Sequence, residues 1–305
     1  MPYEPGVRIL GALLVPLTLV LPLWHLWPAA VSSAQAQKKA GATQAKKVEF
    51  TKGPTGKTAG VCGSKILPLV EGNQWTYGFV DSGLPPRDDL IKLLPSEPGT
   101  IVITVKSIEP KGDETVVHLE EKTTADISKD PKKHVLDERT INSTITCSKT
   151  KFEISPDSFF FSGEPGGSFG VTFDSFERPK DTTWKLAAGV IADQPWREDI
   201  VAHFTRTPFE GSGAKHDSGK LELERKFTPA QPESVNTKIG LYTLAEKLAV
   251  TITGRVTLDH QATDSKPSDL PAAWVNILWL YPNTGVVQVL NSFSHKYQLV
   301  DAQLK

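Results

Sequence analysis

Hydrophobic and polar residues alternate most regularly between Leu248 and Leu258. Apart from Gly254, every second residue of this stretch is apolar, and the residues between are threonine, alanine and arginine. A period of two over this length is typical of a strand buried on one face. A glycine in mid-strand, here Gly254, predicts a bend or bulge that lets a sheet curl. The stretch therefore predicts a long strand in a curved sheet with one apolar face.

The same alternation recurs along the chain, separated by turn-forming residues. The predicted strands are residues 74–80, 100–107, 114–122, 140–148, 200–207, 220–227, 248–258, 274–280, 286–290 and 296–304. A short helix is expected within 85–95, where Asp88 and Asp89 can cap it, and the Phe- and Gly-rich stretch 159–176 predicts a packed irregular loop. Closely spaced strands with few helical periods predict an all-β, or β-dominated, fold: a curved antiparallel sheet or half-barrel with one or two short helices.

The first 36 residues have the features of a targeting segment. Arg8 precedes the apolar run 9–27, and residues 34–36 read Ala-Gln-Ala, a small-x-small cleavage site. These features predict a signal peptide over residues 1–36. The apolar run is also long enough to cross a bilayer, so an uncleaved membrane anchor is the alternative. Both alternatives place the rest of the chain outside the cytoplasm of a bacterium, in the periplasm or the extracellular space.

Residues 37–60 are rich in lysine, glycine and threonine, and this composition predicts a flexible Lys-rich tether. Within it, residues 53–58 read Gly-Pro-Thr-Gly-Lys-Thr, which is similar to a phosphate-binding loop. That motif needs an earlier glycine where Thr51 stands, so we reject nucleotide binding. Residues 61–305 show no break in composition and are expected to form a single β-rich domain.

Charge and cysteine content narrow the function classes. The chain has 34 basic and 35 acidic residues, so it has no basic surplus with which to neutralise nucleic-acid phosphates, and nucleic acid is not an expected partner. The two cysteines, Cys62 and Cys147, predict one disulfide in an oxidising compartment; two unpaired thiols are the alternative. Neither cysteine has a second Cys or a His at zinc-ligand spacing, and no metal or other cofactor is expected.

Candidate catalytic residues are few. His118 and Glu120 lie two residues apart on the polar face of a predicted strand, and His203 lies on the polar face of another, so we expect solvated side chains at all three positions. The adjacent acids Glu120 and Glu121 could serve a glycosidase only if a cleft separated them. No His-Glu-x-x-His motif occurs. The sequence assigns no catalytic residue and predicts a protein that is not an enzyme, with a hydrolase of envelope carbohydrate as a minor alternative.

Three segments resemble landmarks of exported bacterial β-rich proteins of unknown function. Residues 67–77, Leu-Pro-Leu-Val-Glu-Gly-Asn-Gln-Trp-Thr-Tyr, resemble their opening strand, residues 240–248 resemble the turn before a long strand, and 281–299 resemble their closing Tyr-x-Pro and Tyr-x-Leu meander. Those families are akin to curved-sheet carriers of lipoproteins and envelope lipids, so the resemblance implies a half-barrel. The chain departs from them at Asn283 and Thr284, where one glycine of the closing turn is lost. It also has no lipidation cysteine near the cleavage site.

The predicted apolar face suggests how the protein acts. If the sheet curls, a concavity would be lined by Trp75, Tyr77, Ile252, Tyr297 and Leu299. The leading hypothesis is a non-catalytic exported envelope protein whose curved sheet binds an apolar small molecule or a segment of an envelope protein. The alternative is a structural or assembly component of the cell envelope whose inner face is filled by its own residues. Contact with the membrane is expected only through an uncleaved N-terminal segment.

Overall fold

In the computed structural model, the chain divides into two units, Met1–Val48 and Glu49–Lys305. The described residues all belong to the second unit: 51–63, 66–84, 98–126, 136–148, 152–164, 171–178, 194–207, 217–260, 266–269 and 274–305. The predicted signal peptide, the tether up to residue 50 and the helix expected within 85–95 lie outside them. Within these ranges, no helix has the length and apolar character needed to cross a membrane.

Thirteen strands of the described ranges form one antiparallel sheet. They are β1 (Gln74–Val80), β2 (Pro98–Lys111), β3 (Glu114–Asp126), β4 (Leu136–Cys147), β5 (Phe152–Ile154), β6 (Val171–Glu177), β7 (Trp196–Arg206), β8 (Asp217–Thr237), β9 (Gly240–Leu258), β10 (Ser268–Asp269), β11 (Trp274–Tyr281), β12 (Gly285–Leu290) and β13 (Lys296–Gln303). Two short helical segments accompany them, the 3-10 turn η1 (Val61–Gly63) and the α-helix α2 (Phe159–Ser162). The all-β fold class is confirmed, and every strand expected from the alternation is present.

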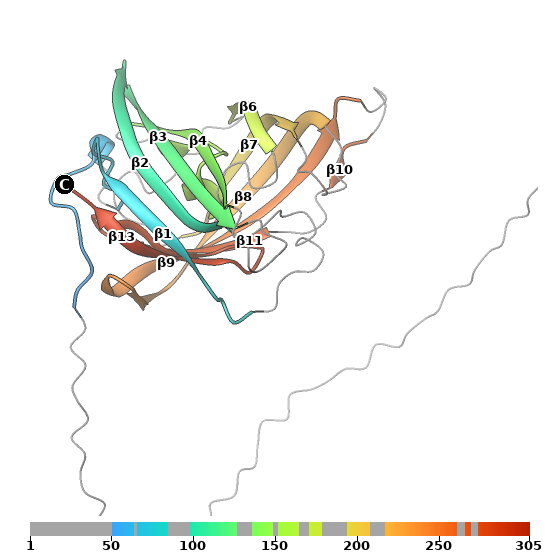
Figure 1. Cartoon of the computed structure of the whole chain (residues 1–305). Coiled ribbons are helices and arrows are strands. Elements are labelled where there is room, and N and C mark those ends of the chain that lie inside the picture. The colour runs from blue at the N-terminus through green and yellow to red at the C-terminus, as the bar shows by residue number, and fades with distance from the viewer. Residues whose placement is uncertain are drawn as a thin grey trace, which may run out of the picture. The chain divides into compact units, whose positions relative to one another are not determined.

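The strand order brings the first and last strands of the folded unit together. The order is β5-β4-β3-β2-β1-β13-β12-β11-β9-β8-β7-β6, with β10 paired to β9. Most neighbours are consecutive in sequence, as in simple antiparallel meanders. The first strand lies beside the last, with Tyr77 opposite Leu299. Figure 1 shows the sheet as a strongly curved surface, and since β5 and β6 end the order, no strand ladder of the described residues closes it.

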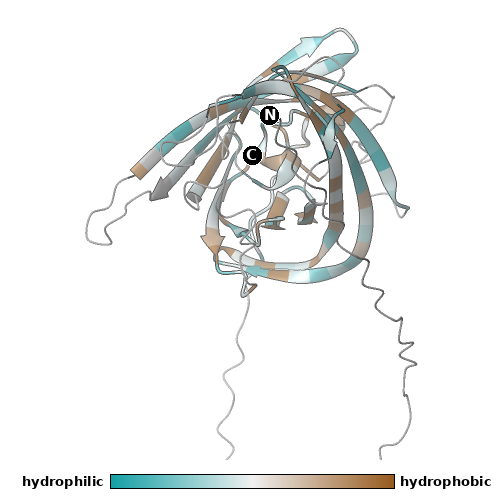
Figure 2. Cartoon of the chain, turned by 90° about the vertical axis from the view of Figure 1, so that its right-hand side faces the viewer, coloured by the Kyte–Doolittle hydropathy of each residue, from teal (hydrophilic) through white to brown (hydrophobic). Residues whose placement is uncertain are grey.

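The alternation of the sequence separates the inner and outer faces of the sheet. Ile101, Ile103 and Val105 of β2 are at most 1% exposed, whereas the residues between them are partly exposed. Brown and teal positions alternate along the strands in Figure 2. The first part of the 248–258 stretch follows the rule, because Leu248 and Val250 are buried and Thr253 is exposed, whereas residues 256–258 are partly exposed on both faces. Each Å² of apolar surface removed from water stabilises the fold by roughly 25 cal/mol, so these rows hold the curved sheet together.

Of the two alternatives predicted at Gly254, a bend or a bulge, the bulge is wrong. Gly254 pairs with Leu223 of β8, and the β8–β9 register runs through this pair without a shift. The irregular register of this hairpin lies instead between Ala230 and Val235. There the distal part of the hairpin approaches β13, where the Nε2 of Gln298 donates to the carbonyl oxygen of Asn236 at 3.4 Å. The backbone pairing at Gly254 is satisfied, so nothing at that position forces a break in the ladder.

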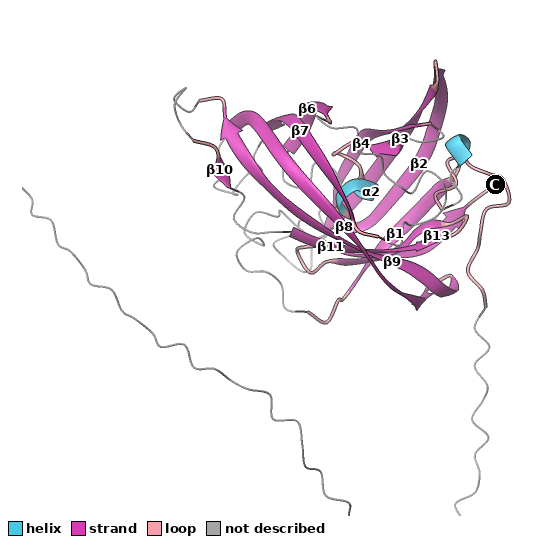
Figure 3. Ribbon diagram, turned by 180° about the vertical axis from the view of Figure 1, so that it is seen from behind, coloured by secondary structure: helices cyan, strands magenta, loops and turns pink. Residues whose placement is uncertain are grey.

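The stretch 159–176 is not wholly irregular, as the sequence had suggested. Residues 159–162 form α2, whose N-cap Ser158 accepts a hydrogen bond from the backbone N of Phe160. The helix ends at Gly163, which has a φ of 70° that suits glycine. Farther along, residues 171–177 form β6 beside β7. Figure 3 shows α2 on the inner side of the curved sheet, so capping residues within an apolar run produced a short helix there.

Residues 51–60, the last part of the predicted tether, are packed on the fold. Leu241 of β9 exchanges backbone hydrogen bonds with this segment: its oxygen accepts from the N of Gly53 at 3.2 Å, and its N donates to the oxygen of Thr51 at 2.9 Å. The N of Gly56 donates to the oxygen of Asn283 at 2.7 Å. Gly53 lies against the ring of Tyr242, where a Cβ would collide with the ring. The glycines that resemble a phosphate-binding loop thus permit close packing.

Candidate functional site

The five residues predicted to line a groove are buried in the folded unit. Their exposed fractions are 0% for Trp75, Tyr77, Tyr297 and Leu299, and 2% for Ile252. Four of them come from the neighbouring strands β1 and β13. Ile252 lies on β9, which the order separates from β13 by β12 and β11. The structure therefore brings four of the five together on one strand pair.

The polar ends of Trp75 and Tyr77 in β1 are hydrogen-bonded to neighbouring backbone. The Nε1 of Trp75 donates to the carbonyl oxygen of Thr284 at 2.6 Å, and the hydroxyl of Tyr77 donates to that of Val286 at 2.8 Å. Burial raises the pKa of Tyr77 well above its ordinary value, and the neighbouring Tyr242 and Glu121 add to the shift. Both rings are thus fixed as parts of the packed interior.

Helix α2 covers these rings. The centroid of the Phe159 ring lies 4.7 Å from that of Tyr77 and 5.8 Å from that of Tyr297. The Phe160 ring meets Trp75 edge-on at 5.7 Å between centroids. The three phenylalanines of α2 are at most 4% exposed. Edge-to-face and tilted ring contacts of this kind add to the area they bury, so the chain itself supplies the apolar partner of the predicted lining.

A buried carboxylate holds the start of α2. Glu121 of β3 is 0% exposed and accepts three hydrogen bonds: from the hydroxyls of Ser143 and Ser158, both at 2.6 Å, and from the backbone N of Phe159 at 2.8 Å. Burial raises the pKa of Glu121, and the three hydrogen bonds oppose that rise. The Phe159 N–H belongs to the first turn of the helix, where it has no acceptor within the helix.

A buried guanidinium holds the other end of α2. Arg225 of β8 is 1% exposed; its Nη2 donates to the carbonyl oxygen of Phe161 at 2.6 Å, and its Cζ lies 3.7 Å from the centroid of that ring. Its Nη1 donates to Glu198 of β7 at 2.9 Å, and Glu198 also accepts from the Nε of Arg178 at 2.6 Å. Burial lowers the pKa of Arg225 to about 10, although Glu198 opposes the shift, so the group stays charged at neutral pH.

A third set of contacts holds the residues just after α2. The Nδ2 of Asn291 donates to the carbonyl oxygen of Gly163 at 3.2 Å and also to the carboxylate of Glu164. The Oδ1 of Asn291 accepts from the backbone N of Phe293 and of His295, both at 3.0 Å. The turn between β12 and β13 is thereby connected to the helix. Glu121 of β3, Arg225 of β8 and Asn291 of the β12–β13 turn bind successive points of one short segment.

The buried carboxylates of the described ranges form hydrogen bonds within the protein. Each of the buried carboxylates in the described ranges, Glu121, Glu164 and Glu198, accepts hydrogen bonds from protein donors. The same ranges contain no group of three His, Cys, Asp or Glu residues that could hold a metal ion. On the outer face, the His118 side chain is 42% exposed, Glu120 faces Lys106 and Lys122, and His203 is exposed, as expected from their place on the polar side.

Reasoning from the sequence missed the residues that hold α2. Their signal was present, because each charged residue falls at a position of the apolar row of its strand. Glu121 follows Val117 and Leu119 at a spacing of two. Arg225 stands between Leu223 and Phe227 in the same way. A charge at an inward position of a strand is costly unless it is paired, so such a residue points to a specific buried partner. The identity of that partner required the fold.

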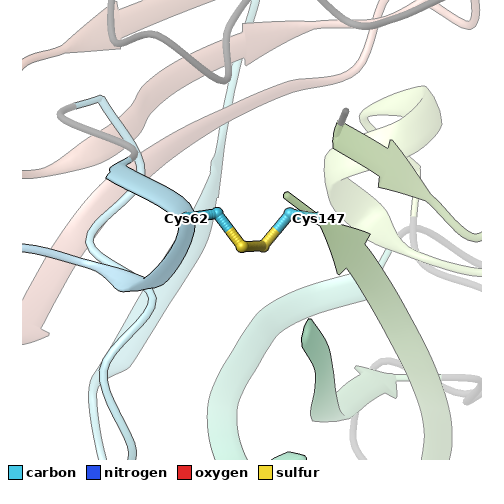
Figure 4. Close-up of a disulfide and its surroundings, with 2 residues drawn as sticks. All are labelled: Cys62 and Cys147. Carbon is cyan, nitrogen blue, oxygen red and sulfur yellow. A yellow bond between two sulfur atoms is a disulfide. The ribbon is translucent and has the colours of Figure 1, made fainter. Parts of the chain in front are cut away.

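The predicted disulfide is confirmed. Cys62 of η1 and Cys147 at the end of β4 are bonded, with their Cα atoms 5.9 Å apart (Figure 4). Cys147 is 0% exposed, which agrees with its place in the apolar row of β4. The bond connects positions 85 residues apart in the sequence. It fastens the N-terminal segment of the folded unit to the strand that precedes β5.

No protein-family model and no curated protein matches the chain. Among solved structures, it is similar to a Bacteroides fragilis protein described as exported and as having a YmcC-like fold, with 14% identity and a TM-score of 0.43, over 79% of this chain and 99% of that one. It is also similar to a protein from Parabacteroides distasonis described as a lipoprotein, with 12% identity and a TM-score of 0.37, over 78% of this chain and 97% of that one.

Proposed function

We propose that this protein is a non-catalytic structural component of the bacterial cell envelope, located outside the cytoplasm. Its curved sheet serves as a stable body whose inner face is filled by its own residues. The observation that supports the proposal is the packing of Phe159 and Phe160 on Trp75, Tyr77 and Tyr297. These are the rings that would otherwise line a groove for an apolar ligand.

Two features support a location outside the cytoplasm. The Cys62–Cys147 disulfide is of the kind that persists in oxidising compartments and is rare in reducing ones. The N-terminal sequence has the apolar run and the Ala-Gln-Ala site of an exported chain. Neither feature depends on the other, and both favour export.

The state of the buried acids supports a non-catalytic role. A general acid or base must reach a substrate proton, and a glycosidase needs two carboxyl groups on either side of a bond. Glu121 and Glu198 instead have their oxygens occupied by serine hydroxyls, a backbone N–H and two guanidiniums. Groups held in this way stabilise the fold.

A lipid-binding assay tests the proposal. Protein purified from an oxidising compartment would be extracted for co-purifying lipid, analysed by mass spectrometry and then titrated with a fluorescent fatty acyl probe. We expect no stoichiometric lipid and no saturable probe binding in a protein that shows a sharp thermal transition. Stoichiometric lipid or saturable binding in the wild-type protein would overturn the structural role.

Binding of an apolar ligand or partner segment is the second candidate function. It is favoured by the fact that α2 is itself a short apolar segment bound to the aromatic face of β1 and β13. An occupant of similar chemistry could take its place. Phe160→Ala enlarges the space beside Trp75, and the exposed Leu136→Ala serves as control. Probe binding by the wild-type protein that Phe160→Ala strengthens and Leu136→Ala leaves unchanged would favour this second function.

A further inference from the structure

The two end strands of the sheet face each other across a seam, which we define as the contact between residues 152–157 and 173–178. The backbone N of Phe173 donates to the Oδ1 of Asp157 at 3.3 Å. At the other end of the seam, the Nη2 of Arg178 donates to the carbonyl oxygen of Ile154 at 3.0 Å. The position numbers rise along one segment as they fall along the other. The two segments therefore run antiparallel, as neighbours in a closed barrel would.

Side chains, and not a backbone ladder, close the seam. In the described part of the chain, β5 pairs only with β4 and β6 only with β7. The Asp157 and Arg178 side chains span the gap, and the Nη1 of Arg178 also lies 3.5 Å from a carboxylate oxygen of Glu153. A ladder would supply a backbone hydrogen bond at regular intervals along both strands. Such ladders join the neighbouring strands elsewhere in the sheet order. We therefore expect the two strands at the seam to separate more easily than any other pair of neighbours.

The seam is connected to α2 through buried charges. The Nε of Arg178 donates to Glu198 at 2.6 Å, Glu198 accepts from Arg225 at 2.9 Å, and Arg225 donates to the carbonyl oxygen of Phe161 at 2.6 Å. The side chains of the three charged residues are at most 5% exposed. A movement of Arg178 removes one of the two cations that balance Glu198. The remaining cation, Arg225, is the group that holds the end of α2.

We propose that the seam between β5 and β6 opens and closes as a unit, with Asp157 and Arg178 as its two closing contacts, and that opening it weakens the hold of Arg225 on α2. This conformational device goes beyond the proposed structural role and does not depend on it. A sheet closed by ladders on every side could expose its inner face only by unfolding. A sheet closed by side chains along one line can do so by a local movement.

The opening should depend on pH through Asp157. Burial raises the pKa of Asp157 from 3.8 to about 6. The carboxylates of Asp174 on β6 and Glu121 on β3 lie near it; Asp174 adds to the rise in pKa, and the hydrogen bond from the N–H of Phe173 opposes it. The other charged groups are those around the second closing contact, Arg178, which pairs with Glu153 and Glu198, and Glu198 also pairs with Arg225. Burial in the closed seam favours the protonated form of Asp157, whereas solvent in the open seam favours its carboxylate form. Opening is therefore favoured as pH rises from 5 to 7, by up to about tenfold, less whatever solvent screening removes.

Hydrogen exchange of the full chain tests the device. Backbone amides of β5 and β6 would be compared by mass spectrometry with those of β2 and β3, after correction for intrinsic rates. We expect β5 and β6 to exchange through local opening, well before the central strands. Arg178→Met should increase their opening by about a hundredfold or more, because it removes one partner of a buried ion pair. Arg197→Met is the matched control, since Arg197 is half-exposed on the outer face of β7 with Asp199 and Glu224, and it should change nothing. If β5 and β6 exchange only together with the central strands in the wild type, the seam does not open.

A second variant tests the pH dependence without removing a buried charge pair. Asp157→Asn keeps an oxygen that accepts from Phe173 but cannot ionise. Opening of the variant should not change between pH 5 and 7, and it should lie below that of the wild type even at pH 5, where the open-seam carboxylate with its ordinary pKa of 3.8 is already ionised. The wild-type protein should show faster β6 exchange at pH 7 than at pH 5, relative to β3. A wild type without this difference, or a variant that retains it, would overturn the role of Asp157.

Discussion

Charged and polar residues on the inner face determine where α2 lies. Glu121 and Arg225 are among the most buried side chains of the described ranges, and each forms a hydrogen bond with the backbone at one end of the helix. Taking a charge out of water is unfavourable, and a fully bonded arrangement offsets that penalty. Apolar packing alone would leave the orientation of three consecutive phenylalanines poorly specified. The charges therefore supply direction, while the rings supply most of the buried area.

Replacing Glu121 should show how much this bonding contributes. Glu121→Ala leaves Ser143, Ser158 and the N–H of Phe159 without their acceptor, and we expect the free energy of unfolding to fall by about 3 kcal/mol. Glu121→Gln retains an acceptor and should lose less. Glu120→Ala, one residue away on the outer face, should have little effect. Urea unfolding of the three variants measures the differences, and equal losses for Glu120→Ala and Glu121→Ala would contradict the assignment.

Glu121 should also affect how the free energy of unfolding depends on pH. Its pKa is raised in the folded state, so protonation favours folding. The stability that Glu121 gains from its raised pKa is present in full at acid pH. It decreases as the pH rises above the ordinary glutamate pKa of 4.5 toward the pKa of Glu121 in the folded protein. Glu121→Gln should remove this decrease. Urea unfolding of both proteins between pH 4 and pH 8 checks it, and parallel curves would rule out the raised pKa.

The two faces of the 248–258 stretch can be tested one residue at a time. Val250 is 1% exposed and lies between Phe227 of β8 and Asn276 of β11, so Val250→Asp should cost about 3–5 kcal/mol. Thr253→Asp, on the exposed face, should cost less than about 1 kcal/mol. Ile252 is a poorer site for this test because it lies opposite Arg225, which could pair with a new carboxylate. Thermal denaturation compares the two variants, and similar melting temperatures would show that the face assignment is wrong.

At the scale of elements, short pieces with few backbone partners are fixed by specific bonds. Helix α2 has four residues and η1 has three, and neither could persist alone. The first is held by Glu121 and Arg225, and the second contains Cys62 of the disulfide. The seam belongs to the same class, because β5 has only three residues and is completed by side chains. The long strands are held by the backbone ladders they form with their neighbours.

Removal of the disulfide should destabilise the fold strongly. The chain-entropy model gives about 4–5 kcal/mol for a loop of this length, and the Cys62→Ala, Cys147→Ala double variant should lose a comparable amount. Alanine avoids placing a new hydroxyl at the buried position 147. Urea unfolding of the variant and of the wild type measures the loss. A thiol count on unfolded, unreduced protein is the control, and two free thiols would show that the bond does not form.

At the scale of the whole molecule, the boundary of the folded unit lies before residue 51. Residues 51–58 bind the turn of the β8–β9 hairpin, the β11–β12 turn and the C-terminal residue, where the oxygen of Lys305 accepts from the N of Lys57 at 2.8 Å. They also cover the ring of Tyr242, which is 0% exposed. This segment therefore completes the fold.

Two truncations test the boundary. A chain of residues 49–305 should melt at the same temperature as one that begins at residue 37. A chain of residues 59–305 should lose about 2–4 kcal/mol, because it lacks these backbone hydrogen bonds and exposes Tyr242. Differential scanning calorimetry compares the three. A shortened chain 59–305 that is as stable as the others would show that the segment is only a tether.

The sequence by itself determined ten of the thirteen strands and the faces of those strands, and it favoured the pairing of the cysteines. These properties depend on local alternation or on simple counting: Ile101, Val250 and Cys147 each face inward because of parity along an extended chain. The same rule placed His118 and His203 outside. Such information is contained in a few neighbouring residues, so no knowledge of the fold is needed to use it.

Only the tertiary structure decided what fills the inner face and how the sheet ends. The stretch 159–176 has no alternation that marks α2 or β6, and both acquire their form from partners far away in the sequence. Phe159 meets a carboxylate 38 positions away, and Arg225 meets a carbonyl 64 positions away. The alternation along β3 indicates that Glu121 faces inward, but it does not indicate which residues bind its carboxylate. Burial makes such contacts strong, and distance along the chain conceals them, because each depends on the register and curvature of the completed sheet.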